Sequence, residues 1–344
     1  MNKIQIKNFT IGDDSPCFII AEIGTGYRNL EEAKTLIDSA VEIGINAIKF
    51  QTFEAETITS KNNIIDMEET GKISQYDLFK KLEISKEVQK SIVDYATSKG
   101  ILIFSAPSHM KDLEFLKELN LPVYKIGSDL ACHIPLLKEV ARLNKPIILS
   151  TGMCTLDEIR ESIHAIKSEG NDKIILLHCV SDYPAKIEDS NLKAIETMKK
   201  EFDLPVGFSD HSLGTLIPLS ASIIGANVIE KHFRDPKNTP SPDDVHSLTK
   251  NDFSFLIQSI RNFEKAKGTG KKSPVGGELK NMDTNRVSLI AMSDIPENSI
   301  ISSDKIDVRR PGTGIPPKFL DSVIGRKTKS MIPKDKPITF DDLA

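Results

Sequence analysis

Cysteines are few in this chain, and no pattern joins them. The four of them, Cys17, Cys132, Cys154 and Cys179, stand far apart and form no CxxC pair. This spacing argues against a disulfide framework. Three of the four lie in or beside apolar segments, so we expect buried free thiols in a reducing cytoplasm.

Long apolar runs and an excess of basic charge are also missing. No apolar run approaches the ~20 residues that a membrane-spanning helix requires, and residues 1–7 alternate like a strand and lack the apolar stretch of a signal peptide. The net charge of -4 provides no basic footprint for nucleic acid or for an anionic membrane. We therefore expect a cytoplasmic protein that binds neither.

Eight short apolar runs alternate with amphipathic stretches of helical spacing, and together they predict a (β/α)8 barrel. The length of 344 residues suits such a barrel of about 250 residues followed by a small domain. A doubly wound sheet is the alternative, but no GxGxxG motif follows the first run. The eight runs are residues 18–22, 47–51, 101–105, 123–126, 146–150, 174–178, 206–209 and 228–232.

Composition changes near residue 267, where glycine, lysine, serine and proline replace the helical pattern. The change predicts a barrel over residues 1–266, a linker over 267–285 and a β-rich domain over 286–344. A second long polar stretch, from Thr52 to Leu82, is expected to be a loop that covers the mouth of the barrel.

Polar side chains gather where the predicted strands end, which is where a barrel of this kind carries its active site. Burying so many charges in a tapered core costs several kcal/mol unless a ligand or metal compensates. These strand-end residues are Glu22, Lys49, Gln51, Lys125, Ser128, Ser150, His178, Ser209, His211, Glu230 and His232.

The residue types at these strand ends indicate two kinds of ligand. Glu230 and His232 are two apart, so on a strand they face the same way, and with His211 they could hold a divalent metal or perform acid–base work. Lys49 and Lys125, with several hydroxyls, suit an anion that carries phosphate and carboxylate groups.

An ordered series of motifs resembles the sialic acid (N-acetylneuraminate) synthases and the related legionaminic and pseudaminic acid synthases. The resemblance covers nearly the whole chain, and the order and spacing of the motifs make it specific. The motifs are Ile-Ala-Glu-Ile-Gly at 20–24, Lys-Phe-Gln-Thr-Phe at 49–53, Lys-Lys-Leu-Glu-Ile-Ser at 80–85, Lys-Ile-Gly-Ser at 125–128, Ser-Thr-Gly-Met at 150–153, Leu-His-Cys-Val-Ser-Asp-Tyr-Pro at 177–184, Gly-Phe-Ser-Asp-His-Ser at 207–212, Glu-Lys-His-Phe at 230–233 and Arg-Pro-Gly-Thr-Gly-Ile at 310–315.

This resemblance implies a (β/α)8 barrel followed by a small antifreeze-like (SAF) domain, in a domain-swapped homodimer. It also implies a reaction in which phosphoenolpyruvate condenses with an N-acylated mannosamine-type sugar and water. The products are a nine-carbon 2-keto sugar acid and phosphate, and the cofactor is a divalent metal, Mn²⁺ or Mg²⁺.

The motif match also implies a role for individual residues. Those implied as catalytic are Glu22, Lys49, Lys125 and Glu230. Those implied to bind phosphoenolpyruvate or the sugar are Gln51, Ser128, Ser150, Ser181, Tyr183, Ser209, Asp243 and Arg310, where Arg310 would reach the partner's sugar site. His211 and His232 are implied as the metal ligands.

Four loop positions depart from the pattern of the resembled family. Residues 24–29 read Gly-Thr-Gly-Tyr-Arg-Asn and lack its Asn-His pair, Ala106 replaces a hydroxyl residue, Leu130 replaces a glutamate, and residues 241–244 read Ser-Pro-Asp-Asp with His246 nearby. Because these loops are expected to face the sugar, Arg28 and Leu130 suggest a deoxy or otherwise substituted sugar, as in the legionaminic or pseudaminic acid synthases.

Three other functions remain open on the residues alone. An aldolase would form a Schiff base at Lys49 or Lys125 and need no metal. A metal-dependent hydrolase would use the same histidines, but would leave residues 286–344 without a role. A sugar-binding protein on an inactive barrel would bind without turnover.

Overall fold

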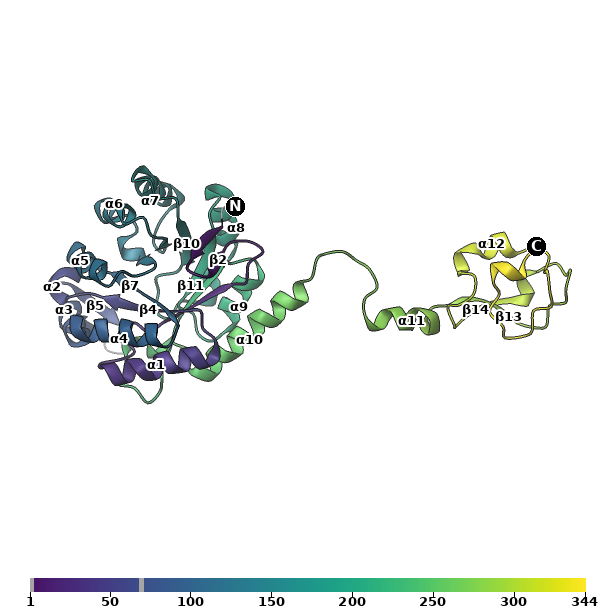
Figure 1. The fold of residues 1–344 in the computed structure, drawn as a ribbon, viewed down its shortest axis with the longest axis horizontal. Helices are drawn as coiled ribbons and strands as arrows, with labels where there is room; N and C mark the ends of the chain where they lie inside the picture. The colour runs from purple at the N-terminus through teal and green to yellow at the C-terminus, as the bar shows by residue number, and fades with distance from the viewer. Residues whose placement is uncertain (1–2, 68–70) are drawn as a thin grey trace. The chain divides into compact units, whose positions relative to one another are not determined.

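The computed structural model describes residues 3–67 and 71–344, which divide into two compact units, Met1–Lys267 and Gly268–Ala344. The first unit is a near-closed barrel of eight parallel strands with helices around it, as the sequence predicts (Figure 1). In hydrogen-bonded order the strands are β7 (Leu102–Pro107), β4 (Ala47–Thr52), β3 (Phe18–Glu22), β12 (Val228–His232), β11 (Val206–Asp210), β10 (Ile174–Cys179), β9 (Ile147–Ser150) and β8 (Tyr124–Ile126).

Each strand is followed by a helix that packs on the outside of the barrel (Figure 1). The helix ends carry local signals: Asn29 caps the first helix by accepting from the Glu32 N–H, and Gly44 ends it in the left-handed conformation. The eight helices are α1 (Leu30–Ile43), α4 (Lys86–Ser98), α5 (Met110–Glu118), α6 (Ile134–Arg142), α7 (Leu156–Ser168), α8 (Lys193–Phe202), α9 (Leu216–Ile223) and α10 (Lys250–Lys267).

Alternation along the strands separates two apolar cores. On β3, Ile19 and Ala21 belong to the large core beneath the helices, while Phe18 and Ile20 belong to the smaller core inside the barrel. The hairpin β1 (Ile4–Ile6) and β2 (Phe9–Ile11) contributes to that inner core. Since side chains on a strand alternate, the next inward position on β3 is Glu22, at the strand end.

The segment from Thr52 to Leu82 differs from the predicted loop. It contains helix α2 (Ala55–Ile58), the antiparallel pair β5 (Ile64–Met67) and β6 (Gly71–Ser74), and helix α3 (Gln75–Leu82). The side chain of Ser74 caps α3 by accepting from the Asp77 N–H. Residues 68–70 of the predicted loop lie outside the described part of the chain.

The second unit has its own small core. Helix α11 (Gly277–Asn285) occupies part of the predicted linker, and strands β13 (Ser288–Ala291) and β14 (Ile306–Arg309) pair antiparallel. The single-turn helix α12 (Leu320–Val323) follows them. Ten buried apolar residues form the core, among them Leu289, Ile301 and Ile338.

The cysteines only partly follow the prediction. Cys17 and Cys179 are buried free thiols, as expected, but Cys132 is exposed and Cys154 is half-buried. Their Sγ atoms lie 3.9 Å apart on the loops that follow β8 and β9. Within residues 3–67 and 71–344, no helix combines the length and the apolar character needed to cross a membrane.

Asp112, in the first turn of α5, makes the stability of the barrel depend on pH. Its side chain is buried and accepts from the Ser108 N–H at 3.1 Å. Burial raises the pKa of its carboxyl from 3.8 to about 6, against the opposing effect of the backbone hydrogen bonds. Because the folded state binds the proton more tightly, the associated stability is complete below pH 3.8 and is lost as the pH rises through about 6.

As the pH rises from 4 to 7, we therefore expect the free energy of unfolding of Asp112→Asn to increase relative to that of the wild type by about 2–3 kcal/mol, because a shift of about two pKa units corresponds to that difference. Urea unfolding of both proteins across this range measures the difference. Asp94→Asn, at an exposed helix position, is the control and should follow the wild type. A constant difference between Asp112→Asn and wild type would contradict the expectation.

Candidate active site

The strand register brings the predicted charged residues to one level of the barrel. Glu22 on β3 is paired in register with Lys49 on β4 and with His232 on β12, and Ser209 on β11 is paired with Glu230 on β12. All lie at the carboxyl ends of parallel strands. Residues that are distant in the chain therefore converge at the mouth.

A buried ion-pair cluster forms the floor of the site. Lys49 Nζ lies 2.8 Å from Glu22 Oε2 and 2.8 Å from Glu230 Oε1. Lys125 Nζ lies 3.7 Å from Glu230 Oε1 and donates to Ser150 Oγ at 2.6 Å. Two ammonium groups thus balance two carboxylates, and a bound dianion would shift this balance.

The cluster sets the protonation of its own members. Burial opposes ionisation of Glu230, but the positive charges of Lys125 and Lys49 outweigh it and lower its pKa to about 2. Burial also lowers the pKa of Lys49, and Glu230 opposes that change. Glu230 therefore stays ionised at neutral pH and is better suited to stabilising positive charge than to accepting a proton.

Around this floor, the Ser128 and Ser181 hydroxyls converge from different loops on Gly152. The Gly152 N–H donates to Ser128 Oγ at 3.0 Å, and a Cβ at this position would collide with Ser181 Oγ. Glycine is thus required for the close approach. Over the described chain, buried Ser181 Oγ and Glu230 Oε2 have no hydrogen-bond partner. Buried atoms of this kind indicate where a polar ligand binds.

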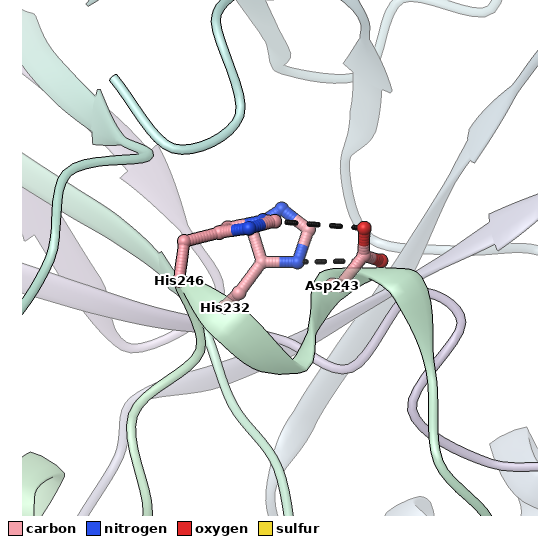
Figure 2. A group of neighbouring side chains, drawn as sticks. All are labelled: His232, Asp243 and His246. Carbon is pink, nitrogen blue, oxygen red and sulfur yellow. Dashed lines mark ion pairs between the residues drawn. The ribbon is translucent and has the colours of Figure 1, made fainter. Parts of the chain in front are cut away.

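Three imidazoles and a carboxylate lie at the mouth. The ring centroids of His211, His232 and His246 are 4.6 to 5.9 Å apart. The Asp243 carboxylate lies 3.6 Å from His232 Nδ1 and 3.9 Å from His246 Nε2, and both rings are directed toward it (Figure 2). One ligand atom from each of His232, Asp243 and His246 falls within 4.8 Å of the others.

The histidines at the mouth are held neutral, which is the form that binds a metal. Burial lowers the pKa of His211 to about 4, lowers that of His232 well below 6.5, and also lowers that of His246. His211 Nδ1 lies 2.8 Å from the Val180 carbonyl oxygen. A proton on Nδ1 would donate to this carbonyl and leave the Nε2 lone pair free.

The loop after β3 holds Asp243 in place. Thr25 Oγ1 donates to Asp243 Oδ2 at 2.6 Å and also contacts the Ser241 hydroxyl. The Arg28 guanidinium donates to the backbone carbonyls of Thr25, Tyr27 and Pro240. Arg28 therefore joins the loops after β3 and β12, beside Asp243.

Not every strand-end residue joins this site. The imidazole of His178 pairs with the Ser190 carbonyl at 2.9 Å and packs against Phe208, as a core histidine does. Arg310 follows β14 in the second unit and is exposed. Tyr183 packs its ring against His211, with centroids 4.2 Å apart, and Gln51 donates to Glu22 Oε1 at 3.1 Å.

Sequence reasoning assigned no role to three residues of the site. Thr25 and Ser241 position Asp243, and His246 faces it. A usable signal was present for the last of these, since Asp243 and His246 are three apart in a loop that follows a strand ending in histidine. Such spacing brings two side chains together on a helical turn, which forms here as a 3₁₀ turn over Pro242–Val245.

Comparison with known proteins finds sugar-acid synthases among the relatives of this chain. The chain is 39% identical over 327 residues to the N,N'-diacetyllegionaminic acid synthase of Legionella pneumophila, covering 92% of this chain and 91% of that protein. It is 37% identical over 334 residues to a pseudaminic acid synthase of Campylobacter jejuni, covering 96% of each.

A solved structure of similar fold is the N-acetylneuraminic acid synthetase of Leptospira borgpetersenii, in complex with citrate. It superimposes with a TM-score of 0.73 at 34% identity, covering 81% of this chain and 95% of that one. Residues 36–272 match the NeuB family model, and residues 286–344 match the SAF domain model. The chain therefore belongs to the NeuB family, and its barrel is followed by a SAF domain.

Proposed function

We propose that this protein condenses phosphoenolpyruvate with an N-acylated mannosamine-type sugar and water, in a reaction that depends on a divalent metal. A bond forms between C3 of phosphoenolpyruvate and the sugar aldehyde carbon, water adds at C2, and the C–O bond to phosphate breaks. The products are a nine-carbon 2-keto sugar acid and phosphate. The buried Lys49–Glu22–Glu230–Lys125 cluster below three histidines is the observation that carries the proposal.

The lysines and serines are the proposed anion site. Lys49 and Lys125 would bind the charged groups of phosphoenolpyruvate, together with hydroxyls of Ser128, Ser150, Ser181 and Ser209. Ser181 Oγ, buried and lacking a hydrogen bond in the described chain, is free to donate to the phosphate. Preorganised donors of this kind also stabilise the phosphate as it leaves.

The histidine cluster fits a divalent metal, because neutral imidazoles and a carboxylate are ligands for such ions. The buried His246 Nε2 has no hydrogen-bond partner in the residues that the structure describes, which supports a ligand at this position. His211 and His232 are the proposed protein ligands. A bound metal would polarise the sugar carbonyl for attack.

Glu230 and Glu22 would have different roles in the reaction. Glu230, held ionised between Lys49 and Lys125, would stabilise the positive charge that develops at C2. Glu22 accepts from Gln51 and would take a proton from the attacking water. Asp243, which Thr25 holds in place, would contact the sugar together with Gln51. Tyr183 would line the phosphoenolpyruvate site.

Three further features belong to this proposal. The sugar would be of the deoxy-diacetamido type, because two relatives are named as legionaminic and pseudaminic acid synthases. The enzyme would be a cytoplasmic homodimer, in which the SAF domain of one protomer supplies Arg310 to the other barrel. Arg310 is exposed in its own unit, so its guanidinium is accessible for this role.

Phosphate release from phosphoenolpyruvate tests the proposal. Chelator-treated protein is incubated with phosphoenolpyruvate and a panel of N-acetylmannosamine and deoxy-diacetamido hexoses, and Mn²⁺ or Mg²⁺ is added back. We expect release that requires both a sugar and a metal, with a product mass equal to sugar plus pyruvate.

Two controls separate this reaction from its rivals. Omission of sugar should abolish phosphate release, and borohydride should trap no lysine adduct. A trapped adduct without phosphate release would indicate an aldolase instead. Sugar binding without turnover of any panel member would contradict the synthase.

A further inference from the structure

We propose that His246 is a third imidazole ligand of the metal centre, so that this chain binds its ion through His211, His232, His246 and the Asp243 carboxylate. The inference rests on the proposed function in one respect, that this site holds a divalent ion. It adds a ligand on the loop after β12 and predicts which class of ion the site prefers.

The ligand atoms of His232, Asp243 and His246 lie within 4.8 Å of one another, and the His211 ring lies beside the other two at a spacing that imidazoles on one ion can adopt. A ring nitrogen bound at about 2.1 Å places the ring centroid about 3.2 Å from the ion. Two imidazoles on one ion therefore have centroids about 4.5 to 6 Å apart over the usual range of bond angles. The observed separations are 4.6 Å for His232 and His246, 5.5 Å for His211 and His232, and 5.9 Å for His211 and His246.

His246 has no other role that the structure shows for its Nε2 atom. The residue is 2% exposed, and Nε2 has no hydrogen-bond partner anywhere in residues 3–67 and 71–344. The nearest acidic atom, Asp243 Oδ1, lies 3.9 Å away, too far for a hydrogen bond. Burying an imidazole nitrogen without a partner is unfavourable, and a bound ion would remove this cost.

The Asp243 carboxylate is prepared as the fourth ligand. Thr25 Oγ1 donates to its Oδ2 atom, and Ser247 Oγ donates to the Asp243 backbone carbonyl at 2.6 Å. The Thr25 bond holds the carboxylate and the Ser247 bond holds its backbone, and the carboxylate faces both rings (Figure 2). Support of this kind from neighbouring hydroxyls is typical of metal-binding carboxylates.

The donor set predicts the ion. Three imidazoles favour Zn²⁺, Co²⁺ and other transition ions, whereas Mg²⁺ prefers an all-oxygen shell and retains its waters. We therefore expect Mg²⁺ to bind at least tenfold more weakly than Mn²⁺ and much more weakly than Co²⁺.

Cobalt binding to the metal-free full chain tests the third ligand. Co²⁺ is titrated by visible absorption, and its dissociation constant is measured by competition with a coloured chelator. For His246→Gln we expect a dissociation constant at least tenfold higher and a changed ligand-field spectrum. His178→Gln, which alters a half-buried histidine outside the cluster, is the control and should match the wild type.

His232→Gln separates this inference from the proposed function. If it abolishes Co²⁺ binding while His246→Gln leaves affinity and spectrum unchanged, the metal centre stands and the role of His246 is overturned. If wild type binds no Co²⁺, or if both variants bind normally, the metal centre itself is overturned.

A measurement on the wild type covers the case in which His246→Gln fails to fold. Electron spin echo spectroscopy of the Mn²⁺ or Cu²⁺ protein counts the coupled imidazole nitrogens. Three coupled imidazoles would support the inference, and two would overturn it.

Discussion

Lys49→Met is expected to lower phosphate release by about 10²–10³-fold, the usual effect of removing one preorganised donor to a developing anion. Lys49 is the ammonium that touches both Glu22 and Glu230, at 2.8 Å each. Its loss removes a proposed phosphoenolpyruvate contact and leaves two buried carboxylates with Lys125 alone. Removing one partner of a buried ion pair also costs about 3–5 kcal/mol of stability.

A second buried lysine in the same barrel provides the control for this stability loss. Lys231 follows Glu230 on β12, points away from the barrel interior and pairs with Asp210 at 2.6 Å. Lys231→Met should therefore lose a similar stability while retaining turnover within about tenfold, when both variants are assayed below their unfolding temperatures. Equal losses of turnover in the two variants would show that Lys49 acts only through the fold.

Gly207→Ala is expected to destabilise the barrel by about 3 kcal/mol or more, the range of severe overpacking. Gly207 lies on β11 between two neighbouring strands. A Cβ there would stand 2.5 Å from the Val228 carbonyl oxygen and 2.7 Å from Leu177 Cδ2. The carbonyl is part of the backbone of β12, so the strands themselves would have to separate. Urea denaturation measures the loss in the free energy of unfolding, from the transition in which the barrel unfolds.

Gly170→Ala distinguishes steric crowding from backbone strain. Gly170 adopts φ +81°, and a Cβ there would meet no atom within 4 Å. Its substitution should cost only about 1–2 kcal/mol, through the left-handed conformation. If the Gly207→Ala protein were as stable as the Gly170→Ala protein, β11 and β12 could separate at this position at little energetic cost, which would contradict the expectation.

Much of the barrel could be predicted from the chain alone, because its parallel strands are buried on both faces and appear as short apolar runs. All eight predicted runs are strands. The segment 52–82 was harder to interpret, because its helices and strands are only four to eight residues long and so leave short patterns in the sequence. The prediction of three buried thiols was confirmed only for Cys17 and Cys179, because an apolar neighbourhood in the chain does not reveal which loop residues remain exposed.

The chemistry of the site followed from residue type and position at strand ends. Glu22, Lys49, Lys125, Glu230, His211 and His232 were all named from the sequence, and the structure brings them together at the mouth. Their catalytic and metal-binding roles stay predictions until they are tested. His178 ends a strand as well, yet it binds a backbone carbonyl, because a strand-end position does not specify the path of the next loop.

Local patterns in the sequence thus sufficed for the order of strands and helices, for the family motifs and for the polar character of the mouth. Tertiary structure alone decided that Lys49 lies between two glutamates, that Arg28 binds carbonyls, and that His246 meets Asp243 and His232. The physical reason is that strand register and loop paths result from contacts between residues far apart in the chain. Such contacts leave little trace in the local spacing of residue types.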